Sequence, residues 1–252
     1  MSAFAGAERH YVFQGREITL PVVVRDAASA AATYLVSAAA ARRLLPSSAL
    51  DVVELLPGRA LFSVACIDYR DNDLGDYNEV SLALFVRERR VHAGIPGGIP
   101  YLGAAVDFAR SRLATYIYRL PVDQTFTCEA GRGVWGFPKT VEQIDFTAVG
   151  ERRRCTLTMG GRQVLTLSVT AGGVRTLPDT PMVTYSMIGG ALHCTRFVSG
   201  AHDVGIHVGG ADLTLGDHPL ADELRALGLP RRALASVWME HSHARFEGPE
   251  RV

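Results

Sequence analysis

The fold class follows from residues 139–170, which read KTVEQIDFTAVGERRRCTLTMGGRQVLTLSVT. Apolar and β-branched residues gather there in three short runs, at 139–146, 154–159 and 163–170. Runs of this length and composition are typical of β-strands, and the Gly160–Gly161 pair between the last two is typical of a hairpin turn. The stretch therefore predicts an antiparallel meander.

The same pattern continues on both sides of the meander. Turn residues recur at short intervals, and strand-like runs lie between them. We predict further strands at 18–24 (ended by Asp26), 32–36, 60–69, 79–86, 115–120, 125–128, 182–188, 192–198, 203–208 and 235–246. So many short strands with frequent turns indicate a sandwich or a barrel.

Helices are expected at only three places. Ser37 is suited to cap a helix over 38–45, which Pro46 would end. A second helix is predicted at 101–112 and a third at 218–227, where Gly228 would form the C-terminal stop. No linker or internal repeat divides the chain, so we expect one domain, residues 1–252, of the β-rich α+β class.

Composition excludes several kinds of protein. The 26 basic and 26 acidic side chains balance, so no electrostatic footprint for nucleic acid or an anionic membrane surface is present. With 48% hydrophobic and 21% charged residues, the chain is expected to be globular. No secretory signal or membrane-spanning run is visible, and the four cysteines form no CxxC pair. We therefore expect a cytoplasmic protein whose thiols are reduced and mostly buried.

The basic residues are unevenly divided between the two types. Twenty-five are arginine, and Lys139 is the single lysine. A compositional bias toward arginine would remove any lysine that arginine can replace. Guanidinium stays protonated and is a poor nucleophile, so a lysine that forms an imine could not be replaced in this way. Lys139 is therefore the first candidate for a catalytic residue.

The sequence around Lys139 supports a pocket. It reads Gly131-Arg-Gly-Val-Trp-Gly-Phe-Pro-Lys139, with glycines that permit tight or left-handed backbone. Trp135 and Phe137 place large apolar surface beside the amine, and Arg132, if it faces inward, would repel the ammonium. The alternative is a surface lysine in a Gly/Pro turn. The arginine bias and the aromatic residues favour the pocket.

A carboxylate is the second candidate. Asp76-Tyr-Asn-Glu79 leads into the apolar run 80–86, where Glu79 could act as a general acid or base. A capped or solvated glutamate at a strand start fits the spacing equally well. The histidines, among them His193, His202 and His207, match no metal-site spacing, so we predict no metal. A lysine imine supplies its own electron sink, so we predict no organic cofactor.

Together these segments resemble the acetoacetate decarboxylase family. The resemblance rests on Gly-Phe-Pro-Lys139 after Gly131-Arg132, on Tyr77-Asn-Glu79, and on the tail segments 218–230 and 238–246. It implies a cone-shaped, mainly antiparallel β-barrel with a few flanking helices, and a homo-oligomer. It also implies that Lys139 is the Schiff-base nucleophile and that Glu79 is the catalytic glutamate.

Three positions depart from the family pattern. Thr140 stands where the decarboxylases have a second, adjacent lysine, so desolvation or Arg132 must disfavour the ammonium instead. The family's second acidic residue falls near Ser63. The arginine that handles the substrate carboxylate corresponds to Arg25 or, in another alignment, to Leu35.

The resemblance thus implies a lyase that decarboxylates a small, acetoacetate-like β-keto acid through a lysine Schiff base. The side chains expected to bind this keto acid or ketone are Arg25, Tyr77, Arg132, Trp135 and Phe137. Two alternatives stay open. One is a Schiff-base aldolase–dehydratase or retro-aldol hydrolase acting on a keto acid, and the other is a non-catalytic small-molecule-binding protein that keeps the pocket.

Overall fold

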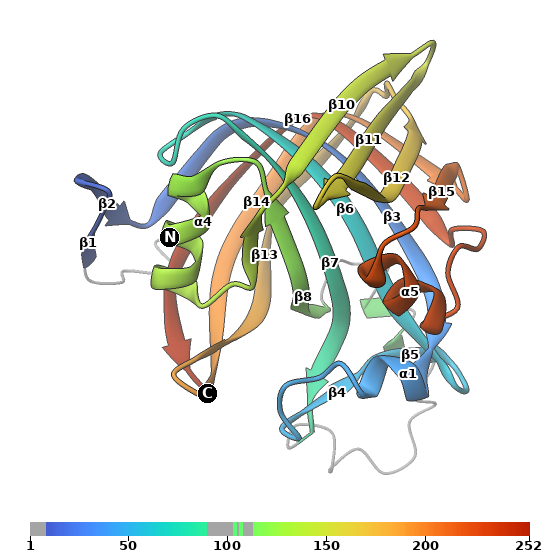
Figure 1. Ribbon diagram of the computed structural model, residues 1–252, viewed down its shortest axis with the longest axis horizontal. Coiled ribbons are helices and arrows are strands. Elements are labelled where there is room, and N and C mark those ends of the chain that lie inside the picture. The colour runs from blue at the N-terminus through green and yellow to red at the C-terminus, as the bar shows by residue number, and fades with distance from the viewer. Residues whose placement is uncertain (1–8, 90–102, 105, 108–112) are drawn as a thin grey trace.

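The computed structural model describes residues 9–89, 103–104, 106–107 and 113–252. Most of these residues belong to strands that curve around a common interior (Figure 1). The helices with defined bounds lie at the margins of the strands. They are α1 (Ala38–Arg42), α4 (Thr125–Trp135) and α5 (Pro219–Ala226).

The main sheet closes on itself to form a barrel. Within the described residues, seven strands complete the ring in the order β7-β6-β3-β16-β14-β13-β8, and β8 pairs again with β7. Neighbours are antiparallel except for the parallel pair β8–β13. The strands are β3 (Val22–Ser37), β6 (Arg59–Asn72), β7 (Tyr77–Glu88), β8 (Ala114–Val122), β13 (Arg175–Ile188), β14 (Ala191–Val208) and β16 (Ala235–Arg251).

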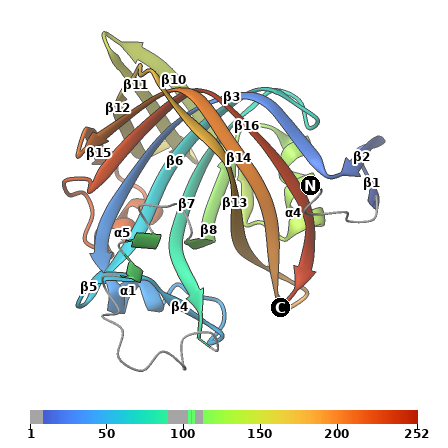
Figure 2. The ribbon, with the colours of Figure 1, turned by 180° about the vertical axis from the view of Figure 1, so that it is seen from behind.

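Smaller elements extend the barrel. The strand β9 (Lys139–Val141) pairs in parallel with β8, and β4 (Leu50–Val52) and β5 (Glu54–Leu56) pair with β7 and β6. A second sheet has the order β10-β11-β12-β15 and contains the predicted meander. Figure 2 shows it beyond the β3–β16 face of the barrel. Its strands are β10 (Gln143–Val149), β11 (Arg152–Met159), β12 (Arg162–Thr170) and β15 (Ala211–Leu215), and β1 (Arg9–Phe13) and β2 (Arg16–Leu20) form a separate hairpin.

The main hydrophobic core lies between the second sheet and the outer surface of the barrel. Phe62 and Val64 of β6 pack there in one cluster with Leu157 and Leu165 of the second sheet. Successive side chains of a strand point to opposite faces, so Ser63 and Ala65 face the barrel interior instead. The core therefore leaves the interior of the barrel free for a cavity.

The predicted β-rich barrel is confirmed, but the strands are longer than expected. Asp26 was predicted to end a strand and instead lies within β3, at an irregularity of the β3–β6 register, where its carboxylate lies 2.9 Å from His241 on the neighbouring strand β16. Segments 192–198 and 203–208 are one strand, β14. Segment 139–146 is divided at Glu142 between β9 and β10, which belong to different sheets.

One predicted element has the wrong type. Residues 125–128 were expected to form a strand and instead begin α4. The side-chain oxygen of Gln124 accepts a hydrogen bond from the Thr127 N–H, which caps the helix. The Ser37 cap, the Gly160–Gly161 turn and a helix at α5 are confirmed, whereas the helix expected at 101–112 falls mostly outside the described residues.

Candidate active site

Lys139 and Glu79 form a buried ion pair inside the barrel. The distance from Lys139 Nζ to Glu79 Oε2 is 2.8 Å, and the two residues are 5% and 6% exposed. Glu79 lies on β7, and Lys139 is the first residue of β9, with β8 paired between these strands. The three neighbouring strands β7, β8 and β9 therefore bring together two residues that are sixty positions apart in the sequence.

The pair lies in the wall of a cavity of about 300 Å³. Trp135 and Phe137 line it, with their rings stacked at 5.9 Å between centroids. The indole N–H of Trp135 donates to the carbonyl of Glu247 at 2.8 Å. Most other lining side chains are aliphatic or aromatic. The sequence prediction of a lysine in an apolar pocket thus agrees with where the structure places Lys139.

The end of α4 fixes the position of Lys139. Gly136 is left-handed, with φ of 65°, and its N–H closes the helix on the carbonyl of Arg132. Gly131, by contrast, has an ordinary helical backbone, and its lack of a side chain leaves room for the side chain of Lys139. A Cβ at Gly131 would lie 2.6 Å from both Cδ and Cε of Lys139. The helix therefore approaches the lysine side chain as closely as a glycine permits.

Two tyrosines surround the ion pair. The Lys139 Nζ lies 4.9 Å from the centroid of the Tyr77 ring, a cation–π distance. Tyr69 donates its hydroxyl hydrogen to Glu79 Oε1 at 3.3 Å and stacks on Tyr77 at 4.5 Å. Burial raises the pKa of both tyrosines well above 10, so both are neutral hydrogen-bond donors at physiological pH. Tyr69 was not predicted, since no local pattern distinguishes it.

The two arginines expected near the amine lie elsewhere. The guanidinium of Arg25 pairs with Asp71 at 2.8 Å and with Asp73 at 2.7 Å, and about half of its side chain is exposed. Arg132 is exposed on α4. Neither residue lines the cavity. Among the described lining residues, Lys139 and Glu79 are the ones that carry a formal charge.

The positions that depart from the family pattern also differ in their surroundings. Ser63 lines the cavity. Thr140 is exposed, so it does not occupy the place of a second buried cation. Leu35 packs against a separate cluster that includes Val53 and Leu61. No arginine therefore replaces the family's carboxylate-binding arginine among the described residues of the wall.

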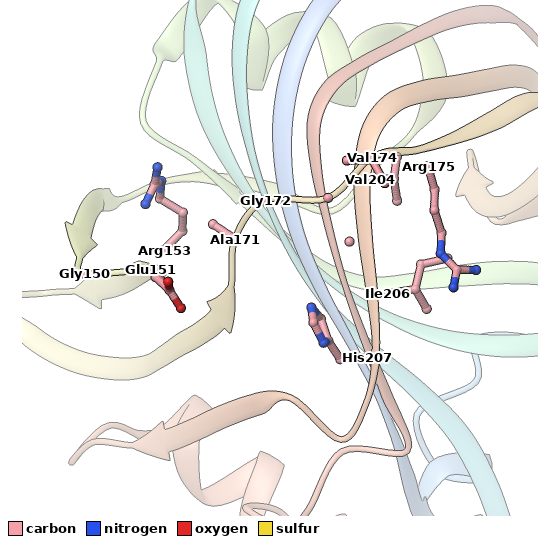
Figure 3. A pocket seen from close by; sticks show the side chains of 12 residues that line it. Gly150, Glu151, Arg153, Ala171, Gly172, Val174, Arg175, Val204, Ile206 and His207 are labelled. Atoms are coloured by element: carbon pink, nitrogen blue, oxygen red, sulfur yellow. The ribbon is translucent and has the colours of Figure 1, made fainter.

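A second hollow, of about 600 Å³, lies outside the barrel near the turn between β12 and β13 (Figure 3). Glycine backbone lines much of it, and Figure 3 shows Arg153 and Arg175 on opposite sides. It contains His207 but none of the predicted site residues.

Among the described residues no three His, Cys, Asp or Glu side chains gather to hold a metal. No helix formed by the described residues has the length and apolarity to cross a membrane.

Comparison with known proteins agrees with the geometry of the site. The family model described as acetoacetate decarboxylase (ADC) matches residues 13–248. The chain belongs to the acetoacetate decarboxylase family. All four cysteines of this family member are free, and three of them are buried. No curated protein is similar enough to count as a relative.

Several solved structures share the fold of this acetoacetate decarboxylase family member. The acetoacetate decarboxylase of Legionella pneumophila subsp. pneumophila str. Philadelphia 1 has a TM-score of 0.66 at 15% identity, over 92% of this chain and 87% of that one. A second acetoacetate decarboxylase has a TM-score of 0.62 at 17% identity, over 92% and 89%. The enduracididine biosynthesis enzyme MppR, in complex with pyruvate, has a TM-score of 0.59 at 20% identity, over 92% and 90%.

Proposed function

We propose that this protein is a carbon–carbon lyase that forms a Schiff base through Lys139 and decarboxylates a small β-keto acid. One observation carries the proposal. The chain's single lysine is buried in an apolar cavity with Nζ 2.8 Å from a buried carboxylate. An amine that reacts with a ketone must first lose a proton, and Glu79 is placed to accept it.

The proton transfer takes place within the buried pair. Moving the proton from the Lys139 ammonium to the Glu79 carboxylate converts two buried charges into a neutral amine and a neutral acid. Each charge of the pair offsets part of the solvation that the other has lost by burial. Acetoacetate decarboxylase is itself the known example of a lysine activated by a neighbouring cation. This chain has no second lysine, and the group beside the amine is a carboxylate, Glu79, which can act as the proton acceptor.

The reaction then proceeds through an iminium ion. The amine of Lys139 adds to the ketone carbon, and Glu79 returns its proton as water leaves. The bond from the α-carbon to the carboxylate breaks, its electron pair forms the enamine, and CO2 departs. The α-carbon takes up a proton, and water then hydrolyses the iminium to release the ketone and the amine. One proton is consumed for each CO2 released.

A second reaction, aldol cleavage or aldol condensation with dehydration, uses the same iminium. One observation favours it. A carboxylate adds a negative charge to a cavity whose ion pair is already balanced, and no guanidinium faces the cavity among the described wall residues. A hydroxyketone adds no such charge, whereas a keto acid in the aldol reaction adds the same charge as a β-keto acid does, so the observation favours an aldol reaction on an uncharged substrate. In the same fold, MppR has been crystallised with the condensation product of pyruvate and imidazole 4-carboxaldehyde.

Reductive trapping tests the imine directly. The protein is incubated with acetoacetate, acetone, pyruvate or a hydroxyketone, borohydride is added, and the mass of the peptide that contains Lys139 is measured. Since the chain has one lysine, a modified lysine can only be Lys139. We expect a stable adduct in the wild type and none in Lys139→Arg, which keeps the positive charge. An unmodified peptide across the panel would support the non-catalytic binding protein instead.

CO2 release and aldehyde release separate the two reactions. CO2 with a β-keto acid supports decarboxylation, whereas aldehyde from a hydroxyketone supports the aldol reaction.

The cytoplasmic location and the homo-oligomer remain predictions. Val174 and Val208, which are 94% and 86% exposed, supply apolar surface that a second subunit could cover. Sedimentation velocity would test the oligomer.

A further inference from the structure

The cavity extends well beyond the ion pair, along the axis of β7. Its wall includes Glu79, Ser81, Ala83 and Phe85, which are alternate residues on one face of that strand. The six residue steps from Glu79 to Phe85 span about 20 Å at about 3.3 Å per step. The wall therefore continues along β7 from the ion pair to Phe85, while other lining residues, among them Val24 and Asn72, lie on the opposite side of the pair.

Small side chains create the space along β7. In the strand register, Ser81 of β7 lies opposite Ala65 of β6, and Ala65 lies opposite Ala31 of β3. The next row pairs Ala83 with Ser63. All five residues line the cavity. A strip of alanine and serine thus covers three neighbouring strands, where larger residues would fill the barrel.

The opposite wall is apolar and adaptable. Met182 of β13, Phe197 of β14 and Met239 of β16 line it. Methionine side chains adjust to irregular apolar shapes. No described residue of either wall beyond Lys139 and Glu79 carries a formal charge. This region therefore suits an uncharged, apolar chain and penalises a charged one.

Among the described residues that line the cavity, Ser29 has a buried hydroxyl without a partner. Ser29 is 4% exposed and lines the cavity, and its Oγ makes no hydrogen bond with the described residues. Ser29 lies opposite Ile67, which lies opposite Glu79, so two strand spacings of about 4.8 Å separate the backbones of Ser29 and Glu79. A buried hydroxyl without a partner is costly, and a ligand oxygen would satisfy it.

We infer that the substrate is a ketone with an uncharged, mainly aliphatic substituent that lies along the Ala31–Ala65–Ser81 strip, and with an uncharged oxygen near the carbonyl that binds Ser29. This inference rests on the proposed Schiff base. The aliphatic substituent fits either reaction, and a substrate for decarboxylation carries the departing carboxylate in addition. A four-carbon keto acid reaches the amine but leaves most of the strip uncovered.

A chain-length series of methyl ketones, from acetone to 2-decanone, tests the inference. The probe is the concentration that gives half-maximal borohydride trapping on Lys139. Each methylene that the strip buries should lower that concentration about fourfold, the equivalent of about 0.8 kcal/mol. An analogue that ends in a carboxylate should lose the gain. A flat series with trapping intact would overturn the inference and leave the Schiff base standing, whereas no trapping at any length would overturn the proposed function.

Two pairs of variants locate the effect. Ala65→Leu places a larger side chain in the middle of the strip and should reduce the ratio of long-chain to short-chain trapping, whereas Ala148→Leu makes the same change on the exposed part of β10 and should keep the wild-type ratio. An unchanged ratio in Ala65→Leu would refute the strip as the binding site. If Ala65→Leu does not fold, the wild-type series still decides.

Ser29 is tested against Ser236, a second buried hydroxyl without a partner that does not line the cavity. The wild type should trap a hydroxyketone about tenfold better than the ketone without the hydroxyl group. Ser29→Ala should remove that preference and Ser236→Ala should keep it. Equal trapping of the two ketones by the wild type would refute the role of Ser29.

Discussion

Gly131→Ala should separate catalysis from stability. The glycine lies in the interior of α4, where alanine is favoured by about 1 kcal/mol. The new Cβ would lie 2.6 Å from Cδ and Cε of Lys139, whereas carbon atoms in ordinary contact are about 3.5 Å apart. The lysine side chain must therefore move by about 0.9 Å. It can do so through its own torsions, so the helix stays intact while Nζ leaves its place beside Glu79.

The expected loss follows from that displacement. A misplacement of about 1 Å at a reacting group can cost about a hundredfold in rate. We therefore expect the rate of borohydride trapping to fall about a hundredfold, with a change in the free energy of unfolding of at most about 1 kcal/mol. Trapping is measured by intact mass against time, and unfolding is measured in urea.

Gly133→Ala is the matched control. It lies on the same helix, and its Cβ would lie 2.5 Å from the ring of Phe13, away from the lysine. It should trap at the wild-type rate while its stability changes through Phe13. If Gly131→Ala traps as fast as the wild type, then the helix does not position Lys139. If both variants lose trapping equally, the effect is a general one on α4.

Three further predictions concern the site and a helix cap. Glu79→Gln leaves the Lys139 ammonium buried without its partner at 2.8 Å. The free energy of unfolding should therefore fall by about 3–5 kcal/mol in urea titrations, and trapping should slow. Wild-type stability in this variant would contradict the ion pair. Burial raises the pKa of Tyr69 and Tyr77, so the folded state holds these protons more tightly than the unfolded chain; that stabilisation is complete below about pH 10 and is lost as the pH rises further. Urea unfolding at pH 9 and pH 11 should show the loss, and Tyr69→Phe should make it smaller. Ser37→Ala removes the oxygen that caps α1 and should cost about 1 kcal/mol of stability with trapping unchanged, whereas an unchanged unfolding midpoint would show that the cap contributes nothing.

The sequence predicted the class of fold and pointed to Lys139 and Glu79, which the structure places side by side, because both leave local signals. The lone lysine stands out against 25 arginines, and the strands alternate in polarity as strands do. The type of residues 125–128 was wrong because Thr and Phe favour strands, and a cap from Gln124 outweighed that preference. Local propensity also could not show that β3 runs through Asp26, since the partner His241 lies 215 positions away.

The surroundings of the amine were harder to predict. The sequence gives no sign that Arg25 pairs with Asp71 and Asp73, because those partners lie 46 and 48 positions away, at and just after the end of β6. Ser29 and Tyr69 have no motif, and they reach the cavity through the register of β3 and β6. Which side chains share a cavity is a property of strand pairing, and a single sequence does not contain it directly.

The ion pair and the far wall of the cavity come from different sets of strands. The ion pair comes from β7 and β9, which flank β8, so one short run of neighbouring strands holds both charged residues of the described wall. The far wall comes from β3, β13, β14 and β16, which come from other parts of the chain. Under the proposed function, substitutions in those strands would reshape the cavity without touching either member of the ion pair.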